Sequence, residues 1–254
     1  MMLADSHAHL DMLDDPDGAV ERARAASVEL ILNPSVDDES FGRALAIAAK
    51  HEGVWAAFGV HPERTRPGAK PLPAAEIAAR AAAPKAVAIG ETGLDYHYEG
   101  FSKRLQKASF AAHIEAAQIT GKPLIVHSRD ADADMAKMLK QAYLSAQFSA
   151  ILHCFAGGEE LLEAAVALGL YVSASGIITY PSAAGLRTLF ARVPQERLLI
   201  ETDSPFLAPQ SQRGKPNEPA YVAAVAEALA KIKGTTAAEM GRITTENFRR
   251  VFKV

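Results

Sequence analysis

Several features are scarce in this sequence, and each scarcity excludes a class of protein. The 254 residues contain one cysteine, Cys154, so no disulfide can form within the chain and a disulfide-stapled secreted domain is excluded. An uninterrupted apolar run of about 18 residues, the length that a membrane-spanning helix needs, does not occur. The first residues lack the basic and apolar segments of a secretory signal. We therefore expect a cytoplasmic protein that does not enter the membrane.

An excess of charge of one sign is also lacking. Lysine and arginine number 27 against 30 aspartates and glutamates, which leaves a formal net charge of -3. Proteins that attract nucleic acid through their overall field usually carry a clear positive excess. Any binding of nucleic acid by this chain must therefore depend on a local group of basic side chains.

A glycine-rich phosphate loop is missing from the first predicted strand-to-helix turn, which reads Ser6-His7-Ala8-His9-Leu10. Its absence disfavours an open, doubly wound sheet, which is the runner-up fold. Strand-like and helix-like segments alternate along the whole chain, and no low-complexity linker divides them. Eight such units in about 250 residues predict a single α/β domain over residues 1–254, a (β/α)8 TIM barrel.

Short apolar runs predict the strands, and alanine-rich amphipathic stretches predict the outer helices. After a run at the N-terminus, the predicted strands are Leu30–Asn33, Trp55–Val60, Ala86–Gly90, Pro123–His127, Ala150–His153, Tyr171–Ala174 and Leu198–Glu201. The predicted helices include Phe41–Lys50, Leu105–Ile119, Asp134–Tyr143 and Leu161–Ala167. Near the end, Thr236 and Glu239 have the spacing of a capping box and predict a closing C-terminal helix.

Metal-capable side chains stand where these strands end. They are His7, His9, Glu91, His127, His153 and Asp203. Side chains in an extended chain alternate between faces, so His7 and His9 share one side. The C-terminal ends of barrel strands surround one active site, so all six are expected to converge. Four imidazoles and two carboxylates exceed the needs of one tetrahedral ion, and a carboxylate can bridge two ions. The pattern predicts the binuclear centre of a metal hydrolase.

The segments around these positions also match a known family. They are Asp5–Asp11, Gly59–Pro62, Gly90–Tyr96, His127–Arg129, His153–Phe155, Glu201–Pro205 and Arg213–Pro219. Together and in this order they resemble the TatD-type deoxyribonucleases, barrels of the amidohydrolase superfamily. The resemblance extends to Glu246-Asn247-Phe248 and covers nearly the whole chain. It implies divalent-metal-dependent hydrolysis of DNA, with removal of nucleotides from 3′ ends as the usual activity.

The resemblance also implies an assignment of ligands. One ion would be held by His7, His9, Glu91 and Asp203, and the second by Glu91, His127 and His153, so that Glu91 bridges. The ions would be two divalent cations, Mg²⁺, Mn²⁺ or Zn²⁺. Imidazoles suit zinc, manganese or iron better than magnesium, whereas phosphoryl chemistry commonly uses magnesium. Asp203 is the candidate that orients a water molecule and accepts its proton. His61, at the end of the third strand, is a candidate contact for the scissile phosphate, with a structural role as the alternative.

The predicted partner is DNA, as a single strand or a 3′ end. Arg129, Arg213 and Lys215 are the candidate phosphate contacts, with plain solvated charge as the alternative. Tyr96 is a candidate substrate contact, and Tyr98, Phe155, Tyr180 and Phe206 are further aromatic residues that can stack on bases. Cys154 has the opposite strand parity to His153 and is interpreted as a packing residue. His113 falls within a predicted helix and is interpreted as structural.

The sequence departs from the family pattern at some positions. Pro181 and Ser182 follow Tyr180 where a basic residue is common, and Phe206 replaces a frequent tyrosine. Two other functional classes stay open. Related barrels activate water against carbonyl carbon, which makes an amidase, a lactonase or an ester deacylase, for example one acting on mis-acylated tRNA, an alternative. A non-catalytic binding module is the third class, and the intact ligand set disfavours it.

Overall fold

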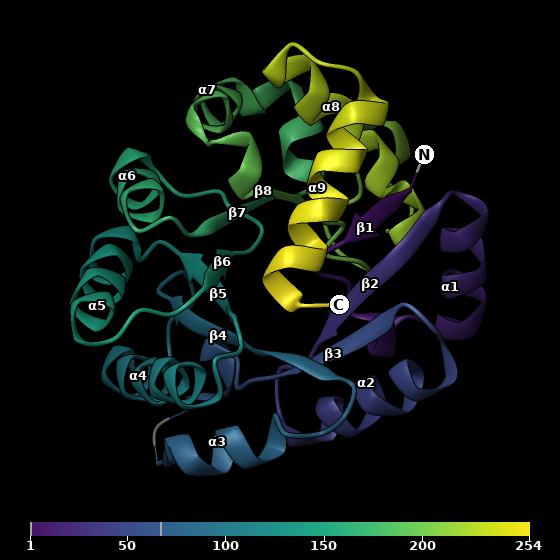
Figure 1. The fold of residues 1–254 in the computed structure, drawn as a ribbon. Helices are drawn as coiled ribbons and strands as arrows, with labels where there is room; N and C mark the ends of the chain where they lie inside the picture. Colours follow the sequence, from purple (N-terminus) through teal and green to yellow (C-terminus); the bar gives the residue numbers. More distant parts are fainter. Residues whose placement is uncertain (1, 67) are drawn as a thin grey trace.

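The computed structural model, which describes residues 2–66 and 68–254, contains eight parallel strands in the order of the sequence (Figure 1). The strands are β1 Leu3–Asp5, β2 Val28–Pro34, β3 Val54–Phe58, β4 Ala86–Asp95, β5 Leu124–Arg129, β6 Ala150–Leu152, β7 Tyr171–Ala174 and β8 Leu198–Ile200. The first and last strands meet where the Ser6 amide donates to the Ile200 carbonyl at 3.0 Å. A bridge between Ala8 and Ser204 extends this closure. The predicted (β/α)8 barrel is confirmed.

Helices surround the barrel, and side chains cap the N-termini of α1, α2, α4 and α9. They are α1 Pro16–Ala25, α2 Asp38–Lys50, α3 Ala74–Arg80, α4 Lys103–Thr120, α5 Asp132–Ser145, α6 Glu159–Ala167, α7 Ala184–Arg192, α8 Val222–Lys233 and α9 Ala237–Phe252. Asp37 and Ser40 form a reciprocal capping box on α2. Thr236 accepts from the Glu239 amide, so α9 begins where the sequence predicts. In the described residues no helix is long and apolar enough to cross a membrane.

Short 3-10 turns lie in the loops that follow the strands or precede them. They are η1 Leu10–Met12, η2 Pro62–Arg64, η3 Gly176–Thr179, η4 Pro181–Ala183, η5 Gln195–Arg197, η6 Gln210–Gln212 and η7 Pro219–Tyr221. The first two carry residues that line the functional site.

One strand differs clearly from its prediction. The fourth strand was expected to end at Gly90, but β4 continues to Asp95. Its register against β5 shifts between Ile89 and Thr92, and pairing then resumes with Thr92 opposite Val126 and Gly93 opposite His127. A Cβ atom at Gly59 would lie 2.4 Å from the Gly90 backbone, so the chains after β3 and within β4 approach as only glycine allows. The shift lets Glu91 enter the barrel while the strand continues.

The seventh strand matches its prediction at both ends, and the C-terminal ends of the remaining predicted strands differ by one or two residues. The third strand stops at Phe58 instead of Val60, because the Val60 amide donates to His113 Nε2 and leaves the sheet. His127 lies within β5, whereas His153 and Glu201 lie just beyond β6 and β8.

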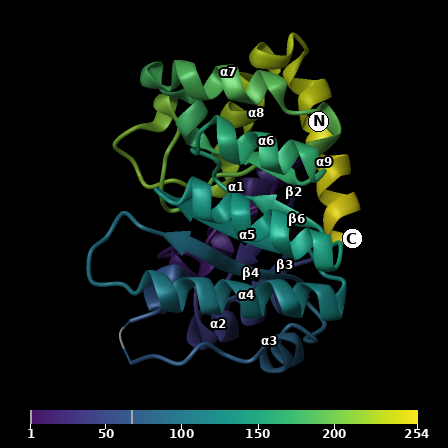
Figure 2. The same ribbon diagram turned by 90° about the vertical axis from the view of Figure 1, so that its left-hand side faces the viewer.

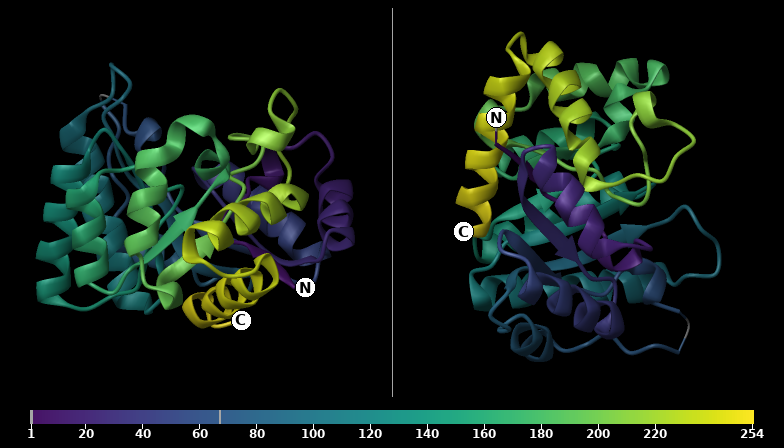
Figure 3. Two further views of the ribbon diagram at one scale, coloured as in Figure 1. Left: turned by 90° about the horizontal axis from the view of Figure 1, so that it is seen from above. Right: turned by 90° about the vertical axis from the view of Figure 1, so that its right-hand side faces the viewer.

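The interior of the barrel is apolar at the end where the strands begin. Each strand contributes one buried side chain to this layer, and three residues of α9 close it. The eight are Ala4, Leu32, Ala57, Ala88, Ile125, Ile151, Tyr171 and Leu199, and the three are Phe248, Val251 and Phe252. Figure 2 shows α9 at one end of the barrel and the long loops after β4 and β8 at the other, and Figure 3 places both chain termini at the α9 end. The α9 end is therefore a closed core, and the opposite end carries the site.

Candidate metal centre

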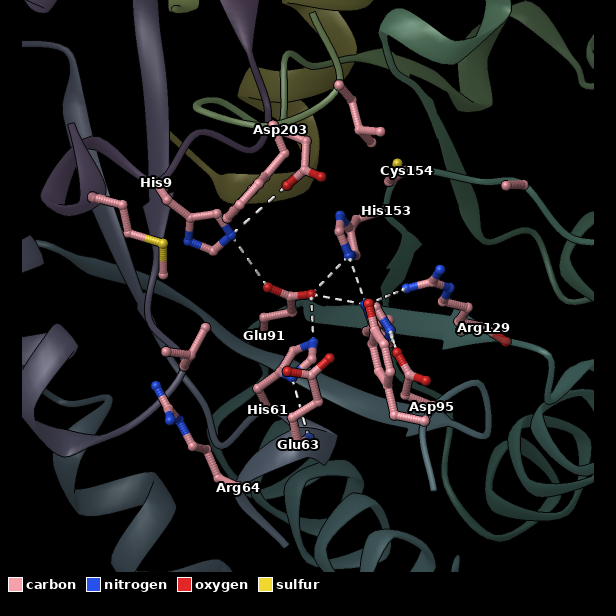
Figure 4. Close-up of a pocket in the computed structure, with 18 of the residues that line it drawn as sticks. His9, His61, Glu63, Arg64, Glu91, Asp95, Arg129, His153, Cys154 and Asp203 are labelled. Carbon is pink, nitrogen blue, oxygen red and sulfur yellow. Dashed lines mark hydrogen bonds and ion pairs between the residues drawn. The ribbon is translucent and has the colours of Figure 1, made fainter. Parts of the chain in front are cut away.

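The metal-capable side chains converge at the carboxyl end of the barrel (Figure 4). Strand periodicity explains two of them: two residues beyond the inward-facing Ile125 and Ile151, the same face presents His127 and His153. Glu91 enters from β4, and His7, His9 and Asp203 follow β1 and β8. All of the six residues except His127 and Asp203 are buried, and those two are half-buried.

The two carboxylate oxygens of Glu91 face different groups of ligands. Oε2 lies 3.4 Å from His7 Nε2 and 3.5 Å from His9 Nε2. The two Nε2 atoms lie 3.2 Å apart, and Asp203 Oδ1 is 3.7 Å from each of them. We call these four residues the first ligand set.

The other oxygen, Oε1, faces the opposite group. It lies 2.9 Å from His153 Nε2, 3.0 Å from His127 Nδ1 and 3.5 Å from His61 Nε2. His127 Nδ1 and His153 Nε2 are 3.4 Å apart. We call Glu91, His127 and His153 the second ligand set. A single carboxylate thus joins the two sets, as the bridging prediction requires.

The donor atoms of both sets fit a divalent cation. Ligands that bind at about 2.1 Å in a tetrahedron lie about 3.4 Å from one another, close to the spacing of these atoms. Facing imidazole nitrogens 3.2 Å apart, as in His7 and His9, need a proton or a cation between them. Burial and the charge of His153 lower the pKa of His7 to about 4, so this ring is neutral near pH 7 and one of its nitrogens has a lone pair for a cation.

Neighbouring groups determine which nitrogen of each ring faces the site. His9 Nδ1 lies 3.3 Å from the Pro34 carbonyl, and His153 Nδ1 lies 3.3 Å from Glu201 Oε1. Because these oxygens accept, both rings keep a proton on Nδ1 and turn Nε2 to the site, where a bound cation would take the place of any proton on that nitrogen. His127 is reversed: its Nε2 donates to Asp95 Oδ2 at 2.9 Å, and Nδ1 faces Glu91.

Sequence reasoning did not assign Asp95 to the site. The signal was present, because Glu91, Gly93 and Asp95 alternate onto one face of an extended chain. Ending the predicted strand at Gly90 concealed this relation, and β4 in fact includes all three residues. The Asp95 carboxylate orients His127 and also accepts from the His97 amide at 2.9 Å.

Burial and neighbouring charge shift the pKa values of the two carboxylates, Glu91 and Asp203, in opposite directions. Burial opposes ionisation of Glu91, but the charge of His153 outweighs it and holds the pKa of Glu91 well below the usual range. Burial raises the pKa of Asp203 to about 7. Glu91 is therefore a fixed negative charge, whereas Asp203 is a carboxyl group that exchanges its proton near neutrality when no cation is bound.

His61 differs from the ligands because its proton is on the nitrogen that faces the site. Its Nδ1 accepts a hydrogen bond from the Glu63 amide at 3.2 Å, so the ring proton is on Nε2. That N–H points to the site, where it can donate to Glu91 or to a substrate oxygen.

An open cavity of about 620 Å³ lies over the metal centre. Arg129 lines it, with its guanidinium 5.1 Å from the Tyr98 ring centroid. The other candidate substrate contacts, Tyr96, Arg213 and Lys215, are not among the described residues that line it. The Tyr96 hydroxyl donates to Asp134 at 2.8 Å, Arg213 stacks on Tyr180 at 4.9 Å, and Lys215 contacts Gln212.

Of the remaining residues that the sequence singled out, some line the cavity and others are buried in the core. Tyr98 and Phe206 line the cavity and are about half exposed. Phe155 is buried and packs against Phe190, so the expectation that it stacks on bases is wrong. His113 is also buried, and both ring nitrogens have partners, Ser109 and Val60. Burial raises the pKa of Cys154 well above its usual value, so its thiol stays protonated although it lines the cavity.

Comparison with known proteins agrees with this geometry. The sequence profile described as TatD related DNase matches residues 4–253. The chain belongs to this family. It is 38% identical to the uncharacterized metal-dependent hydrolase YcfH of Escherichia coli strain K12, over all of this chain and 97% of that protein. The protein named 3′-5′ ssDNA/RNA exonuclease TatD from Enterobacter lignolyticus is 33% identical over 94% of each chain.

A solved structure supports the same conclusion for the fold. The crystal structure of YjjV, a TatD homologue from Escherichia coli, superposes with a TM-score of 0.89 over 99% of this chain and 98% of that chain, at 29% identity. Family membership and the ligand clusters together make this chain a metal-dependent hydrolase.

Proposed function

We propose that this chain hydrolyses phosphodiester bonds of DNA and removes nucleotides from the 3′ end of single or frayed strands, with two divalent ions. The division of Glu91 between two ligand sets carries the proposal, since it suits one carboxylate shared by a pair of cations. A family relative bears the name of an exonuclease that acts on single-stranded DNA and RNA from the 3′ end.

The first ligand set would hold one ion and the second set the other, as Mg²⁺, Mn²⁺ or Zn²⁺. When bound, such a pair lowers the pKa of a water molecule and neutralises charge on the phosphoryl group. The imidazole-rich donor set favours zinc or manganese.

The chain's own residues then divide the remaining work. Asp203 lines the cavity and would orient the attacking water and accept its proton. The Nε2–H of His61 would donate to the scissile phosphate, which agrees with its tautomer. Glu91 would keep the two ligand sets at a fixed separation.

Arg129 is the substrate contact that the geometry favours most. It lines the cavity, and Tyr98 holds its guanidinium through the ring face and a 3.3 Å hydrogen bond to the hydroxyl. A planar guanidinium suits phosphate oxygens. Arg213 and Lys215 would contact the strand farther from the reacting bond. Tyr96, with its hydroxyl bonded to Asp134, would act by supporting the loop that carries Tyr98.

The test uses chelator-treated protein to which each metal is restored separately. Substrates are 5′-labelled single-stranded DNA, duplex DNA and RNA, each with a free or a blocked 3′ end. We expect shortening of single-stranded DNA from a free 3′ end and little cleavage of blocked strands. Hydrolysis of a lactone, an amide or an aminoacyl ester without any cleavage of oligonucleotides would overturn the proposal in favour of a carboxyl hydrolase.

A substitution tests the chemical step. Asp203→Asn removes the proton acceptor and should lower turnover at saturating metal by at least about 10²-fold. Glu160→Gln is the control, because Glu160 is an exposed carboxylate on α6, outside the cavity lining and outside both ligand sets. Near-normal turnover of the Asp203 variant would contradict the assigned role.

A further inference from the structure

Two groups of residues on different sides of Glu91 form much of the rim of the cavity, and the loops after β6 and β7 contribute Ala156 and Ile177. One group follows β8, β1, β2 and β3, which are neighbours around the closed barrel. It contributes Met12, Val36, Glu63, Arg64 and Phe206 to the cavity. The other group, after β4 and β5, contributes Tyr98 and Arg129. Figure 4 shows Arg64 and Arg129 on different sides of Glu91.

An exposed aromatic ring is held in place on the first side. Phe206 is 51% exposed, and its centroid lies 6.3 Å from that of the ligand His9. Met12, 37% exposed, lines the same cavity from the loop after β1, the strand next to β8 in the closed barrel. We call Met12 and Phe206 the apolar shelf. Exposed apolar area is unfavourable in water, by about 25 cal/mol for each Å², so a fixed apolar surface beside a ligand indicates a binding surface.

The loop that carries Phe206 is tied to the core by Asn217. This buried side chain donates to the Phe206 carbonyl at 2.6 Å and to the Thr202 carbonyl at 2.8 Å. The Phe206 amide in turn donates to the Asp203 carbonyl at 2.9 Å. The ring is therefore pre-positioned at a fixed distance from the metal ligands, and little conformational entropy is lost when a flat group stacks on it.

The two sides of the rim differ in charge. On the shelf side Arg64 is paired with Asp37 at 3.1 Å, and Glu63 adds a second carboxylate. These three groups sum to about one negative charge at neutral pH. On the other side Arg129 contacts Tyr98 and has no carboxylate within 4.0 Å among the described residues. Asp95, the nearby carboxylate, is bonded to His127.

We propose that the apolar shelf binds the base of the 3′-terminal nucleoside, with its free 3′-hydroxyl toward Glu63, and that Tyr98 and Arg129 bind the preceding nucleotide. This rests on the proposed function. The net negative charge beside the shelf is compatible with an uncharged 3′-hydroxyl and repels an additional phosphate group. The positive charge of Arg129 attracts the phosphates of the preceding nucleotides. One exposed ring face stacks on one unpaired base, so a paired end must open before it binds.

The role of the apolar shelf can be tested by affinity measurements alone, with two proteins and two oligonucleotides compared in a double-mutant cycle. The metal-loaded protein is titrated with single-stranded oligonucleotides whose last linkage has a methylene group in place of the bridging oxygen. The 3′-terminal base is either present or replaced by an abasic sugar. Removing it should weaken binding to the wild type by about tenfold, the scale of one stacked base. Phe206→Leu should bind the intact strand about tenfold more weakly and be nearly indifferent to the abasic end.

Matched variants separate the two sides. In Tyr98→Leu, loss of the terminal base should still weaken binding, but an abasic sugar at the preceding position should no longer do so. Phe206→Tyr should behave as the wild type. Leu144→Ala, an exposed apolar residue on α5, should change neither. A 3′-phosphate should weaken binding to the wild type, and Glu63→Gln should reduce this effect.

The outcomes distinguish this inference from the function on which it rests. If loss of the terminal base weakens binding to Phe206→Leu as much as to the wild type, the proposed role of the apolar shelf is wrong. Equal affinity of the wild type for 3′-hydroxyl and 3′-phosphate ends would also contradict it. If the wild type shortens DNA from the 3′ end in these cases, the proposed function stands without the shelf. A wild type that neither binds nor cleaves any oligonucleotide overturns both.

Discussion

The two ends of the barrel use the same eight strands for opposite purposes. At the α9 end, inward-facing positions carry Ala4, Ile125 and Leu199, which pack beneath Phe248. Two residues later along β5 the same face presents the ligand His127. Along β5 the strand periodicity is unchanged between the layers, so only the residue type changes from apolar to metal-binding.

Burial has a different consequence at each end. At the α9 end it removes apolar area from water and stabilises the fold. At the site it makes isolated charge costly, so that Glu91 and His153 are tolerated only because opposite charges face them. We therefore expect substitutions at the site to change metal binding and turnover, and substitutions at the α9 end to change the free energy of unfolding.

The largest effect is expected for Glu91→Ala. Removing the carboxylate shared by both ligand sets should reduce the metal content from about two ions per chain to nearly none and abolish hydrolysis. Metal analysis after gentle purification measures this directly. Glu63→Ala, which removes a carboxylate from the same cavity, should keep both ions. Retention of two ions by the Glu91 variant would refute the bridge.

Phe248→Ala should lower the stability of the protein without a loss of metal. This fully buried ring lies 4.6 Å from that of Phe252 and closes the apolar layer. Its loss should lower the free energy of unfolding by about 3–5 kcal/mol, as for other buried aromatic residues. Urea unfolding measures the loss, and metal content per folded chain should stay unchanged. A variant that loses metal but keeps its stability would break the distinction between the two ends.

His113 is a histidine near the site whose substitution should affect stability and not metal binding. Burial lowers its pKa from 6.5 to about 4. As the pH falls from 6.5 to 4, the unfolded chain takes up a proton that the folded chain refuses, so the stabilisation present above pH 6.5 is lost. This loss amounts to about 3 kcal/mol.

The measurement is the free energy of unfolding against pH for the wild type and His113→Gln, since the other histidines titrate in both. The difference between the two proteins should change across this pH range. Parallel curves would show that His113 does not titrate as described. His113→Ala should leave the metal content unchanged, because neither ring nitrogen faces a ligand set.

The smallest effect is expected outside the cavity. If Arg213 and Lys215 contact the strand away from the metal centre, the Arg213→Ala/Lys215→Ala pair should reduce the slope of log affinity against log salt by about one to two units. Turnover at saturating substrate should change less than affinity. Arg192→Ala, on α7, is the control and should leave the slope unchanged. Equal slopes for the wild type and the pair would show that this loop does not contact phosphates.

Local sequence was sufficient to predict the barrel and the candidate ligands. Apolar runs of strand length, each ending in a histidine or carboxylate, need only the alternation of side chains to place His7 with His9 or to turn His127 inward. Capping residues such as Asp37 and Thr236 likewise act within one turn of helix. These signals depend on neighbours along the chain, so the chain order reveals them.

Tertiary structure alone decided how those residues are used. The proton positions of His127 and His153 depend on Asp95 and Glu201, which lie 32 and 48 residues away in sequence. The burial of Phe155 depends on Phe190. Whether a cation such as Arg213 lines the cavity depends on the path of a loop, which no periodicity specifies. Alternation fixes the face on which a side chain lies, but its proton, its partner and its access to substrate are set by groups that only folding brings into contact.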